Sequence, residues 1–312
     1  MIEWIPFDRL IPIEQIGKGG FGSVYSATWL NGIRKIKKIK KTDADNNVNG
    51  NIDNNYSVDD DNVDDVNDGY SDNDDSDDDF DNHMKCTVEG SKLKIYGLTQ
   101  NTETNEYLMV FQYADNGSLH KFLKENFRDL TWLDKLKLLY DIVIDLRDIH
   151  NAGYIHADFH SGNILQHKGI SEKLQSYVSD LGLSKKYTEN DSGGIYGVMP
   201  YVAPEVLLGQ KFTKAADIYS FGVIMSEMST GQRPFDGYEF NFDLAIKICE
   251  GLRPEFAQGT PNCYIELAKQ CMDVDSLKRP DALKVYHKLG EWIINMERSN
   301  NKIKMQFLEA DK

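Results

Sequence analysis

The chain has 312 residues, enough for one large or two small domains, and 40% of them are hydrophobic, as in an ordinary globular protein. No apolar run approaches about 18 residues, and the N-terminus shows no basic region followed by an apolar core, so we expect neither a membrane span nor a signal peptide. The four cysteines show no C-x-x-C spacing. This pattern favours reduced thiols in an intracellular, cytoplasmic protein and argues against a zinc site.

The net charge of −15 comes from one segment of the chain. Sixteen aspartates lie between Asp43 and Asp81, with no Lys or Arg among them, and taking these 16 negative charges away leaves about +1 for the rest. A nucleic-acid partner is not expected, because such a tract repels phosphates. Residues 42–82 also contain too few apolar side chains to offset chain entropy, so we expect a disordered insert.

Residues 7–36 have the pattern of strands around a glycine-rich turn. Gly17, Gly19 and Gly22 form G-x-G-x-x-G between two strand-like stretches, and Asn31-Gly32 favours a hairpin turn. Glycines let backbone N–H groups approach phosphates without intervening side chains. A plain glycine-rich hairpin is the alternative interpretation of this stretch taken alone.

Beyond the acidic segment, residues 93–99 and 107–111 read as two more strands. Residues 131–151 predict a long helix, because apolar side chains recur at spacings of three and four, with Thr131 as its N-cap and Gly153 as its stop. Apolar positions from 244 to 292 predict further helices. The polar residues from about Ser299 are expected to fray.

A short polar turn, residues 156–163, follows the long helix and holds Asp158 and Asn163 five residues apart. An Asp so placed can orient a hydroxyl and accept its proton, and an Asn can reach a metal ion. Asp180 follows in Ser179-Asp180-Leu181-Gly182, and Ala203-Pro204-Glu205 comes later. A simple helix-terminating turn is the interpretation of residues 156–163 without this context.

The four motifs, in this order, resemble the signature set of the eukaryotic protein kinase family. The H-x-D-F-H-x-x-N form of the loop is similar to tyrosine-kinase-like groups, notably those expanded in fungi. The resemblance implies an α+β, bilobal protein kinase fold over residues 7–297. A small β-rich lobe of about 7–111 would be interrupted by the insert, a mainly helical lobe would cover about 115–297, and 298–312 would be a tail.

The resemblance also implies ATP and Mg²⁺ as cofactors and a protein as the second substrate. Asp158 would be the base for the substrate hydroxyl, and His160 would donate a hydrogen bond to the γ-phosphate. Asn163 and Asp180 would hold the magnesium, because hard cations prefer oxygen ligands. The residues expected to bind the nucleotide are Ile16 and Val24 over the adenine, Gly17, Gly19, Gly22 and Lys37 at the phosphates, and the backbone of Gln112 and Ala114 at the adenine edge.

Three further residues have structural roles by the same resemblance. His156 should pack in the core and hold the loop, and Asp217 should bind the loop backbone. Glu205 should pair with Arg279.

The small lobe departs from the family pattern. Lys35 stands where the family has a small Ala. The family also has a helix Glu that pairs with the strand Lys, but no Glu lies between Ile16 and Glu89, and Asp79 stands near the position of that Glu as a candidate partner for Lys37. In the large lobe, Ala157 replaces the usual Arg and Val198 the usual Thr. The acidic segment beside Lys37 is also a candidate competitor of ATP phosphates for that lysine.

Two functions remain open from the sequence. The first is a protein kinase acting on Ser or Thr, less favourably on Tyr, which the intact Asp158, Asn163 and Asp180 support. The alternative is a weak or inactive pseudokinase that acts as a signalling scaffold, because a fold alone does not establish activity. A small-molecule phosphotransferase is disfavoured by the Ala-Pro-Glu motif at residue 203.

Overall fold

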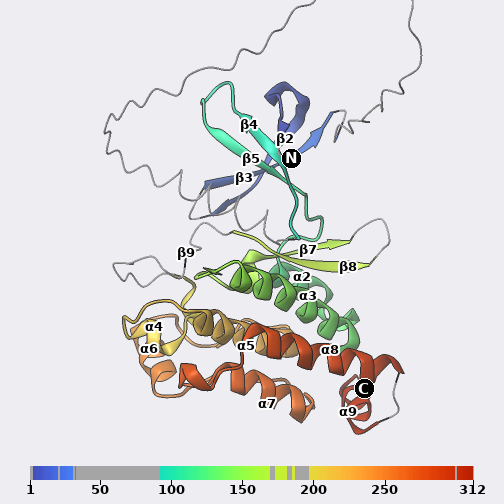
Figure 1. Ribbon diagram of the computed structural model, residues 1–312, viewed down its shortest axis with the longest axis vertical. Coiled ribbons are helices and arrows are strands. Elements are labelled where there is room, and N and C mark those ends of the chain that lie inside the picture. The colour runs from blue at the N-terminus through green and yellow to red at the C-terminus, as the bar shows by residue number, and fades with distance from the viewer. Residues whose placement is uncertain are drawn as a thin grey trace, which may run out of the picture.

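The computed structural model describes residues 3–19, 22–30, 32, 92–168, 173–180, 185–186, 197–298 and 301–311. These residues form a small lobe built from strands and a large lobe built mainly from helices (Figure 1). This is the α+β, bilobal arrangement that the motif order predicts. The N-terminus lies in the small lobe, and the C-terminus lies at the far end of the large lobe (Figure 1).

The small lobe contains two sheets with the strand orders β1-β4-β5 and β2-β3. Their strands are β1 (Glu3–Trp4), β2 (Leu10–Gly19), β3 (Gly22–Trp29), β4 (Ile95–Gln100) and β5 (Tyr107–Phe111). A 3-10 turn, Phe7–Arg9, joins β1 to β2. Within the stretch predicted as strands over 7–36, β2 and β3 confirm strands, whereas 7–9 form the 3-10 turn and 33–36 lie outside the described residues. The strands predicted at 93–99 and 107–111 are confirmed as β4 and β5, with β2 antiparallel to β3 and β4 antiparallel to β5.

The first strand extends the small lobe beyond its expected start at residue 7. β1 pairs in parallel with β4, with Glu3 opposite Gly97. A side chain at Gly97 would collide with the Glu3 carbonyl oxygen, so the glycine permits this close approach. Ile5 is fully buried just after β1. Two residues are too few to reveal a strand by their pattern, and their partner lies far along the chain.

The large lobe packs eight helices and four short strands among the residues described. The helices are α2 (Leu119–Asn126), α3 (Trp132–Asn151), α4 (Pro204–Leu207), α5 (Lys214–Thr230), α6 (Phe242–Cys249), α7 (Asn262–Cys271), α8 (Ala282–Arg298) and α9 (Lys302–Ala310). The strands are β6 (Tyr154–Ile155), β7 (Ile164–Lys168), β8 (Leu174–Val178) and β9 (Lys185–Lys186). Further 3-10 turns cover Phe127–Asp129, Ser161–Asn163, Met199–Tyr201 and Ser276–Lys278.

Helix α3 is the long helix predicted over 131–151. The Thr131 hydroxyl accepts the Asp134 N–H at 3.2 Å, and the Asp134 carboxylate accepts the Thr131 N–H at 3.1 Å. This reciprocal pair is a capping box, which satisfies two otherwise unpaired N–H groups at the start of the helix. Gly153, with a φ of +87°, follows the end of the helix in a conformation that glycine adopts without strain.

Helix α5 forms the centre of the large lobe. All of its residues from Ala216 to Ser229 are buried, so the helix has no solvent-facing side. A side chain at Gly222 would come within 2.7 Å of Met272 and 2.9 Å of Cys271. The glycine therefore allows α7 to pack directly on α5.

Residues 302–310 form helix α9, so the expectation of a frayed tail was wrong for them. In α9, Phe307 is fully buried, with its ring 5.6 Å from Trp132 and 5.7 Å from Trp292 between centroids. The Asp311 carboxylate accepts the Trp132 N–H at 2.7 Å and so caps the start of α3. The buried Phe307 ring and the Asp311 cap therefore order a segment whose polar composition alone predicts a solvent-exposed, irregular chain.

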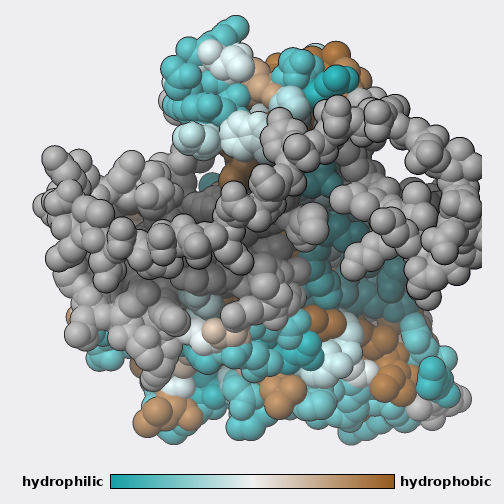
Figure 2. Space-filling view, turned by 45° about the horizontal axis from the view of Figure 1, so that its top comes forward, coloured by the Kyte–Doolittle hydropathy of each residue, from teal (hydrophilic) through white to brown (hydrophobic). Residues whose placement is uncertain are grey.

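In the face that Figure 2 shows, hydrophilic residues predominate and the apolar ones form small separate patches. Among the described residues, none of the helices is both long enough and apolar enough to cross a bilayer.

Candidate active site

The loop between β6 and β7, residues 156–163, places Asp158 and Asn163 side by side. The Asn163 amide donates to the Asp158 carbonyl oxygen at 3.0 Å and to its Oδ2 at 3.1 Å. The other carboxylate oxygen, Asp158 Oδ1, is buried and accepts no hydrogen bond from any residue described. Leaving a buried acceptor unpaired is costly, so this oxygen is available to a donor beyond the described residues, such as a bound substrate.

The backbone of this loop is held by Asp217, a buried residue in the first turn of α5. Its Oδ2 accepts the His156 N–H at 2.9 Å, and its Oδ1 accepts the Ala157 N–H at 3.1 Å. His150, in the last turn of α3, places Nε2 2.8 Å from Asp217 Oδ2. The predicted contact between Asp217 and the loop backbone is therefore confirmed.

Two residues of the site have a left-handed backbone that non-glycine residues rarely adopt. The φ angle is +65° at Ala157 and +60° at Asp180. Each such residue costs roughly 1 kcal/mol or more, and the surrounding structure must compensate. At Ala157 the compensation includes the hydrogen bond to Asp217. Strain of this kind concentrates at functional sites because it points a particular side chain in a required direction.

His156 is fully buried beneath the loop, as expected of a structural residue. Its Nε2 lies 3.1 Å from the Ser179 carbonyl oxygen and so carries the proton, while Nδ1 accepts the Asp158 N–H at 3.3 Å. Burial lowers the pKa of His156 and favours this neutral form. The imidazole thus joins residue 158 to residue 179 on the neighbouring strand end.

His160 contacts Asp158 directly. Its Nδ1 accepts the Gly162 N–H at 3.0 Å, which leaves the proton on Nε2, and Nε2 lies 3.5 Å from Asp158 Oδ2. Burial opposes the charge on Asp158, but His160, His156 and Asn163 outweigh it and hold the pKa of Asp158 below its usual value. Asp158 is therefore a carboxylate at neutral pH, as a proton acceptor must be.

Asp180 follows β8 and is brought toward Asn163 by the pairing of β7 with β8. Ser179, the residue before it, donates to the Asn163 carbonyl oxygen from both its N–H and its hydroxyl, at 2.9 Å each. The Asn163 Oδ1 accepts no hydrogen bond from the residues described, because the amide nitrogen faces Asp158. One amide oxygen and one carboxylate fit a magnesium ion that takes its other ligands from phosphates and water. The described residues contain no cluster of three His, Cys, Asp or Glu that would form a complete metal cage.

The nucleotide side of the site consists of a hairpin and a connecting strand. Gly19 lies opposite Gly22 and Gly17 opposite Val24 across β2 and β3. The side chains of Ile16 and Val24 are 53% and 55% exposed, so both are uncovered where the resemblance expects them to meet an adenine.

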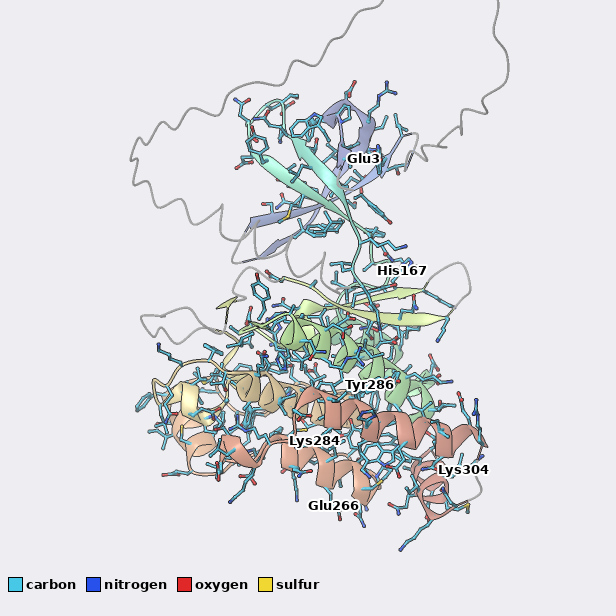
Figure 3. The ribbon with its side chains drawn as sticks, viewed as in Figure 1. Glu3, His167, Glu266, Lys284, Tyr286 and Lys304 are labelled. Carbon is cyan, nitrogen blue, oxygen red and sulfur yellow. The ribbon has the colours of Figure 1, made fainter. Side chains whose placement is uncertain are left out.

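The connection between the lobes begins at Gln112. Its N–H donates to the Lys94 carbonyl at 2.8 Å, and no described residue uses the Gln112 carbonyl or the Ala114 N–H. Asp115 then fixes the chain to β7, because its Oδ1 accepts the Lys168 N–H at 2.8 Å and lies 3.1 Å from His167 Nδ1. His167 lies where the two lobes meet (Figure 3). The two free backbone groups are those that the resemblance assigns to the adenine edge.

Several predicted features lie outside the described residues. They are Lys35, Lys37, Asp79 and the acidic insert 42–82. The roles assigned to them stay predictions.

One buried polar network escaped the sequence-based prediction. The Tyr201 hydroxyl donates to Glu227 Oε2 at 2.6 Å and therefore accepts from the Ser161 hydroxyl at 3.0 Å. His120 of α2 places Nδ1 2.9 Å from Glu227 Oε1. Burial and the Glu227 carboxylate raise the pKa of Tyr201 well above its usual value. The network links α2, the 156–163 loop and α5. The one feature of the sequence that could have revealed it is Glu227, the lone carboxylate within the otherwise uncharged second half of α5.

The predicted pair of Glu205 and Arg279 is confirmed. The guanidinium donates to both carboxylate oxygens, at 2.6 and 2.7 Å, and its side chain is fully buried. It also donates to the Ala215 carbonyl at 2.9 Å and lies 5.2 Å from the Tyr219 ring centroid. A bidentate pair of this kind fixes α4 against the rest of the large lobe.

Comparison with known proteins agrees with this geometry. The family model described as protein tyrosine and serine/threonine kinase matches residues 70–289. Two Dictyostelium discoideum proteins named "Probable serine/threonine-protein kinase", roco8 and roco5, are 34% identical over 59% of this chain and 32% identical over 58%. A third protein of that organism, named Cyclic GMP-binding protein C, is 26% identical over 89% of the chain. The chain covers only 10%, 7% and 11% of these three relatives.

Proposed function

The chain belongs to the protein tyrosine and serine/threonine kinase family, and we propose that it is an active kinase that transfers the γ-phosphoryl group of ATP to a serine or threonine of a protein. The observation that carries the proposal is the buried, unpaired Oδ1 of Asp158. The names of two of the relatives support Ser or Thr as the acceptor. Tyrosine is the less favoured acceptor, and the fungal type of subgroup stays a prediction.

Asp158 is the proposed base. Its Oδ1 accepts a hydrogen bond from the substrate hydroxyl and takes the proton as the oxygen attacks phosphorus. Asn163 holds the other carboxylate oxygen at 3.1 Å, so the acceptor keeps one orientation. The lowered pKa of Asp158 keeps the group unprotonated before the substrate arrives.

Asn163 and Asp180 are the proposed ligands of Mg²⁺. When bound, MgATP supplies the phosphoryl group, and the metal neutralises its oxygens. The chain contributes the amide oxygen of Asn163 and the carboxylate of Asp180, held together by the two hydrogen bonds from Ser179 to Asn163. Ile16, Val24, the three glycines, Lys37 and the backbone of Gln112 and Ala114 would bind the nucleotide.

For His160 the geometry favours a positioning role over donation to the γ-phosphate. Both ring nitrogens already have partners in the chain, the Gly162 N–H and the Asp158 carboxylate. Nε2–H supports Asp158 Oδ2 together with Asn163 and leaves Oδ1 for the substrate. A neutral imidazole also brings less positive charge to the site than a lysine would.

The second candidate function is a pseudokinase scaffold. It is favoured by Lys35 in the position of a small residue and by the absence of Glu from 17 to 88. Everything that supports activity lies in the large lobe, whereas these departures lie in the small lobe.

The test is transfer of radiolabelled phosphate from ATP with magnesium to a generic basic protein and to the chain itself, for the wild type beside Asp158→Asn. The substitution keeps the shape of the side chain and removes the proton acceptor, so we expect a loss of about 10²- to 10⁴-fold in rate. Asp129→Asn, at an exposed carboxylate on a surface turn, is the matched control and should retain full rate.

Two results would contradict the proposal. Equal transfer by wild type and Asp158→Asn would show that residue 158 is not the base. An absence of transfer by the folded wild type, with nucleotide binding measured separately, would favour the scaffold.

A further inference from the structure

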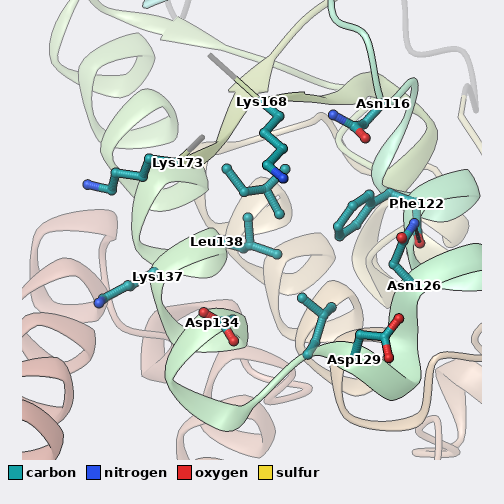
Figure 4. Close-up of a pocket in the computed structure, with 11 residues that line it drawn as sticks. Asn116, Phe122, Asn126, Asp129, Asp134, Lys137, Leu138, Lys168 and Lys173 are labelled. Carbon is teal, nitrogen blue, oxygen red and sulfur yellow. Dashed lines mark hydrogen bonds between the residues drawn. The ribbon is translucent and has the colours of Figure 1, made fainter. Parts of the chain in front are cut away.

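A pocket of about 540 Å³ lies on the large lobe and shares no lining residue with the candidate active site. It is enclosed by α2, the turn into α3, the first turns of α3 and the facing ends of β7 and β8 (Figure 4). Its floor is apolar and consists of Phe122, Leu130, Leu138 and Leu174. A pocket of this size with an apolar floor and a polar rim is suited to a ligand or peptide side chain.

The rim of the pocket is charged, with opposite signs on opposite sides. Lys168 and Lys173 lie at the β7–β8 side, and neither forms an ion pair with a residue that the structure describes. Asp129 and Asp134 lie at the other side, where Asp134 accepts from the Thr131 N–H and hydroxyl. Lys137, the third rim lysine, is paired with Glu297 at 2.7 Å. Among the described residues, the rim therefore offers two lysines outside ion pairs beside an apolar floor, and Lys173 is attracted at longer range to Asp141 and Glu297.

The chain itself contains a segment with the complementary chemistry. Residues 43–81 carry 16 aspartates and no Lys or Arg, but apolar residues are interspersed among them. Val63 and Val66 flank Asp64 and Asp65, and Phe80 lies between Asp79 and Asp81. Phe80 has a carboxylate on either side, and Val63 and Val66 have one on one side; such apolar side chains beside carboxylates match the apolar floor and the two rim lysines.

The end of this segment is attached close to the pocket. Lys92 lies 3.7 Å from both Asp141 and Asp145 on α3. Asp141 is one helical turn, about 6 Å, beyond Lys137 of the pocket rim, and it also interacts electrostatically with Lys173. The 12 residues from Phe80 to Lys92 can span up to about 40 Å, so tethering raises the local concentration of the acidic segment at the pocket.

We propose that the acidic segment 43–81 docks in this pocket of its own large lobe, with an Asp-flanked apolar side chain on the floor and carboxylates at Lys168 and Lys173. The docked segment links the small lobe to α2 and α3 of the large lobe. This inference does not depend on whether the chain is an active kinase.

The test uses the full chain and a water-soluble carbodiimide, which joins a carboxylate to an amine in contact with it as an amide. After separation of the cross-linked monomer from any dimer, mass spectrometry identifies the joined peptides. We expect the monomer to contain links from 43–81 to Lys168 and Lys173. The yield should fall at 0.5 M salt, because ion pairs at the surface are screened.

Two variants make the test specific. In Lys168→Glu/Lys173→Glu, Lys137 is the only described amine left on the pocket rim, and its yield of cross-links to the segment should fall by about threefold or more. Protection of the pocket floor from hydrogen exchange should fall by a similar factor. Lys121→Glu/Lys124→Glu, on α2 but outside the pocket lining, is the matched control and should change neither. Leu130→Asp places a charge on the floor and should have the same effect as the first variant.

Three outcomes would overturn the proposal. Links from the segment mainly to Lys35–Lys41 would place it at the nucleotide side. Equal links to Lys121 and Lys124 would show that its contacts are unspecific. Links found only in the dimer would mean that the segment binds a second copy of the chain.

Discussion

The two sides of the candidate active site are built differently. On the side of the large lobe, side chains fix the loop: the buried Asp217 holds its backbone, and the half-buried Asn163 holds Asp158. On the nucleotide side, the chain offers free backbone groups at the hinge and two exposed apolar side chains, Ile16 and Val24. Proton transfer requires particular side chains at fixed positions, whereas backbone groups and apolar contact tolerate many sequences. This difference agrees with the location of the departures from the family pattern, which are most severe in the small lobe.

The largest effect should come from removing the support under the loop. Asp217→Ala leaves two backbone N–H groups and His150 without their buried acceptor. We expect phosphoryl transfer to be lost and the free energy of unfolding to fall by about 3 kcal/mol or more. Urea denaturation measures the second effect. Unchanged stability and activity would show that the loop keeps its shape without Asp217.

A second substitution tests a buried carboxylate on α3, outside the site. Burial raises the pKa of Asp145 to about 7, although Lys92 and the Val178 N–H lower it in part. In the unfolded chain the group titrates near about 3.9, so between these values the folded state binds more protons. The stability contributed by this group is therefore fully present below about pH 4 and is lost as the pH rises through 7.

Asp145→Asn removes this charge and keeps an acceptor for the Val178 N–H. We expect it to stabilise the protein more at pH 8 than at pH 5, with a difference of about 2 kcal/mol. Urea denaturation of wild type and variant at both pH values measures it, and Asp129→Asn at an exposed position should show no such difference. Equal shifts at both pH values would mean that Asp145 stays ionised.

A smaller effect should follow from separating the two contacts of His160. In His160→Asn the side-chain oxygen can still accept the Gly162 N–H, but residue 160 no longer reaches Asp158 Oδ2, which keeps only its hydrogen bond from Asn163. We expect kcat to fall by about tenfold, with little change in KM for ATP or in stability. A rise in KM for ATP at constant kcat would instead favour the direct contact with the γ-phosphate.

The smallest effect should come from the nucleotide side. Val24→Ala removes two methyl groups from an exposed side chain, so stability should change by less than about 0.5 kcal/mol. If Val24 covers the adenine, KM for ATP should rise by about fivefold to fifteenfold. Tyr25→Ala, on the opposite face of β3, is the control. Equal KM values for the two variants would move the nucleotide away from this strand.

The sequence alone determined the elements whose signals are local. The spacing of apolar residues and the Thr131 cap predicted α3, and the short run of apolar residues at 107–111 predicted β5. The order of four motifs predicted the two lobes and the residues of the 156–163 loop. Within one helix pattern, cap or motif the residues lie close together in the chain, where periodicity and capping act.

Other contacts join residues that are far apart in the chain and have no local sequence signal, and only the tertiary structure decided these. It joined Ser161, Tyr201, Glu227 and His120 into one buried network, placed β1 beside β4, and ordered the polar C-terminal segment around Phe307 as α9. Each of these contacts depends on burial of a polar or aromatic group against a surface formed by distant parts of the chain. No local pattern encodes that surface, because it exists only after the helices and sheets have packed.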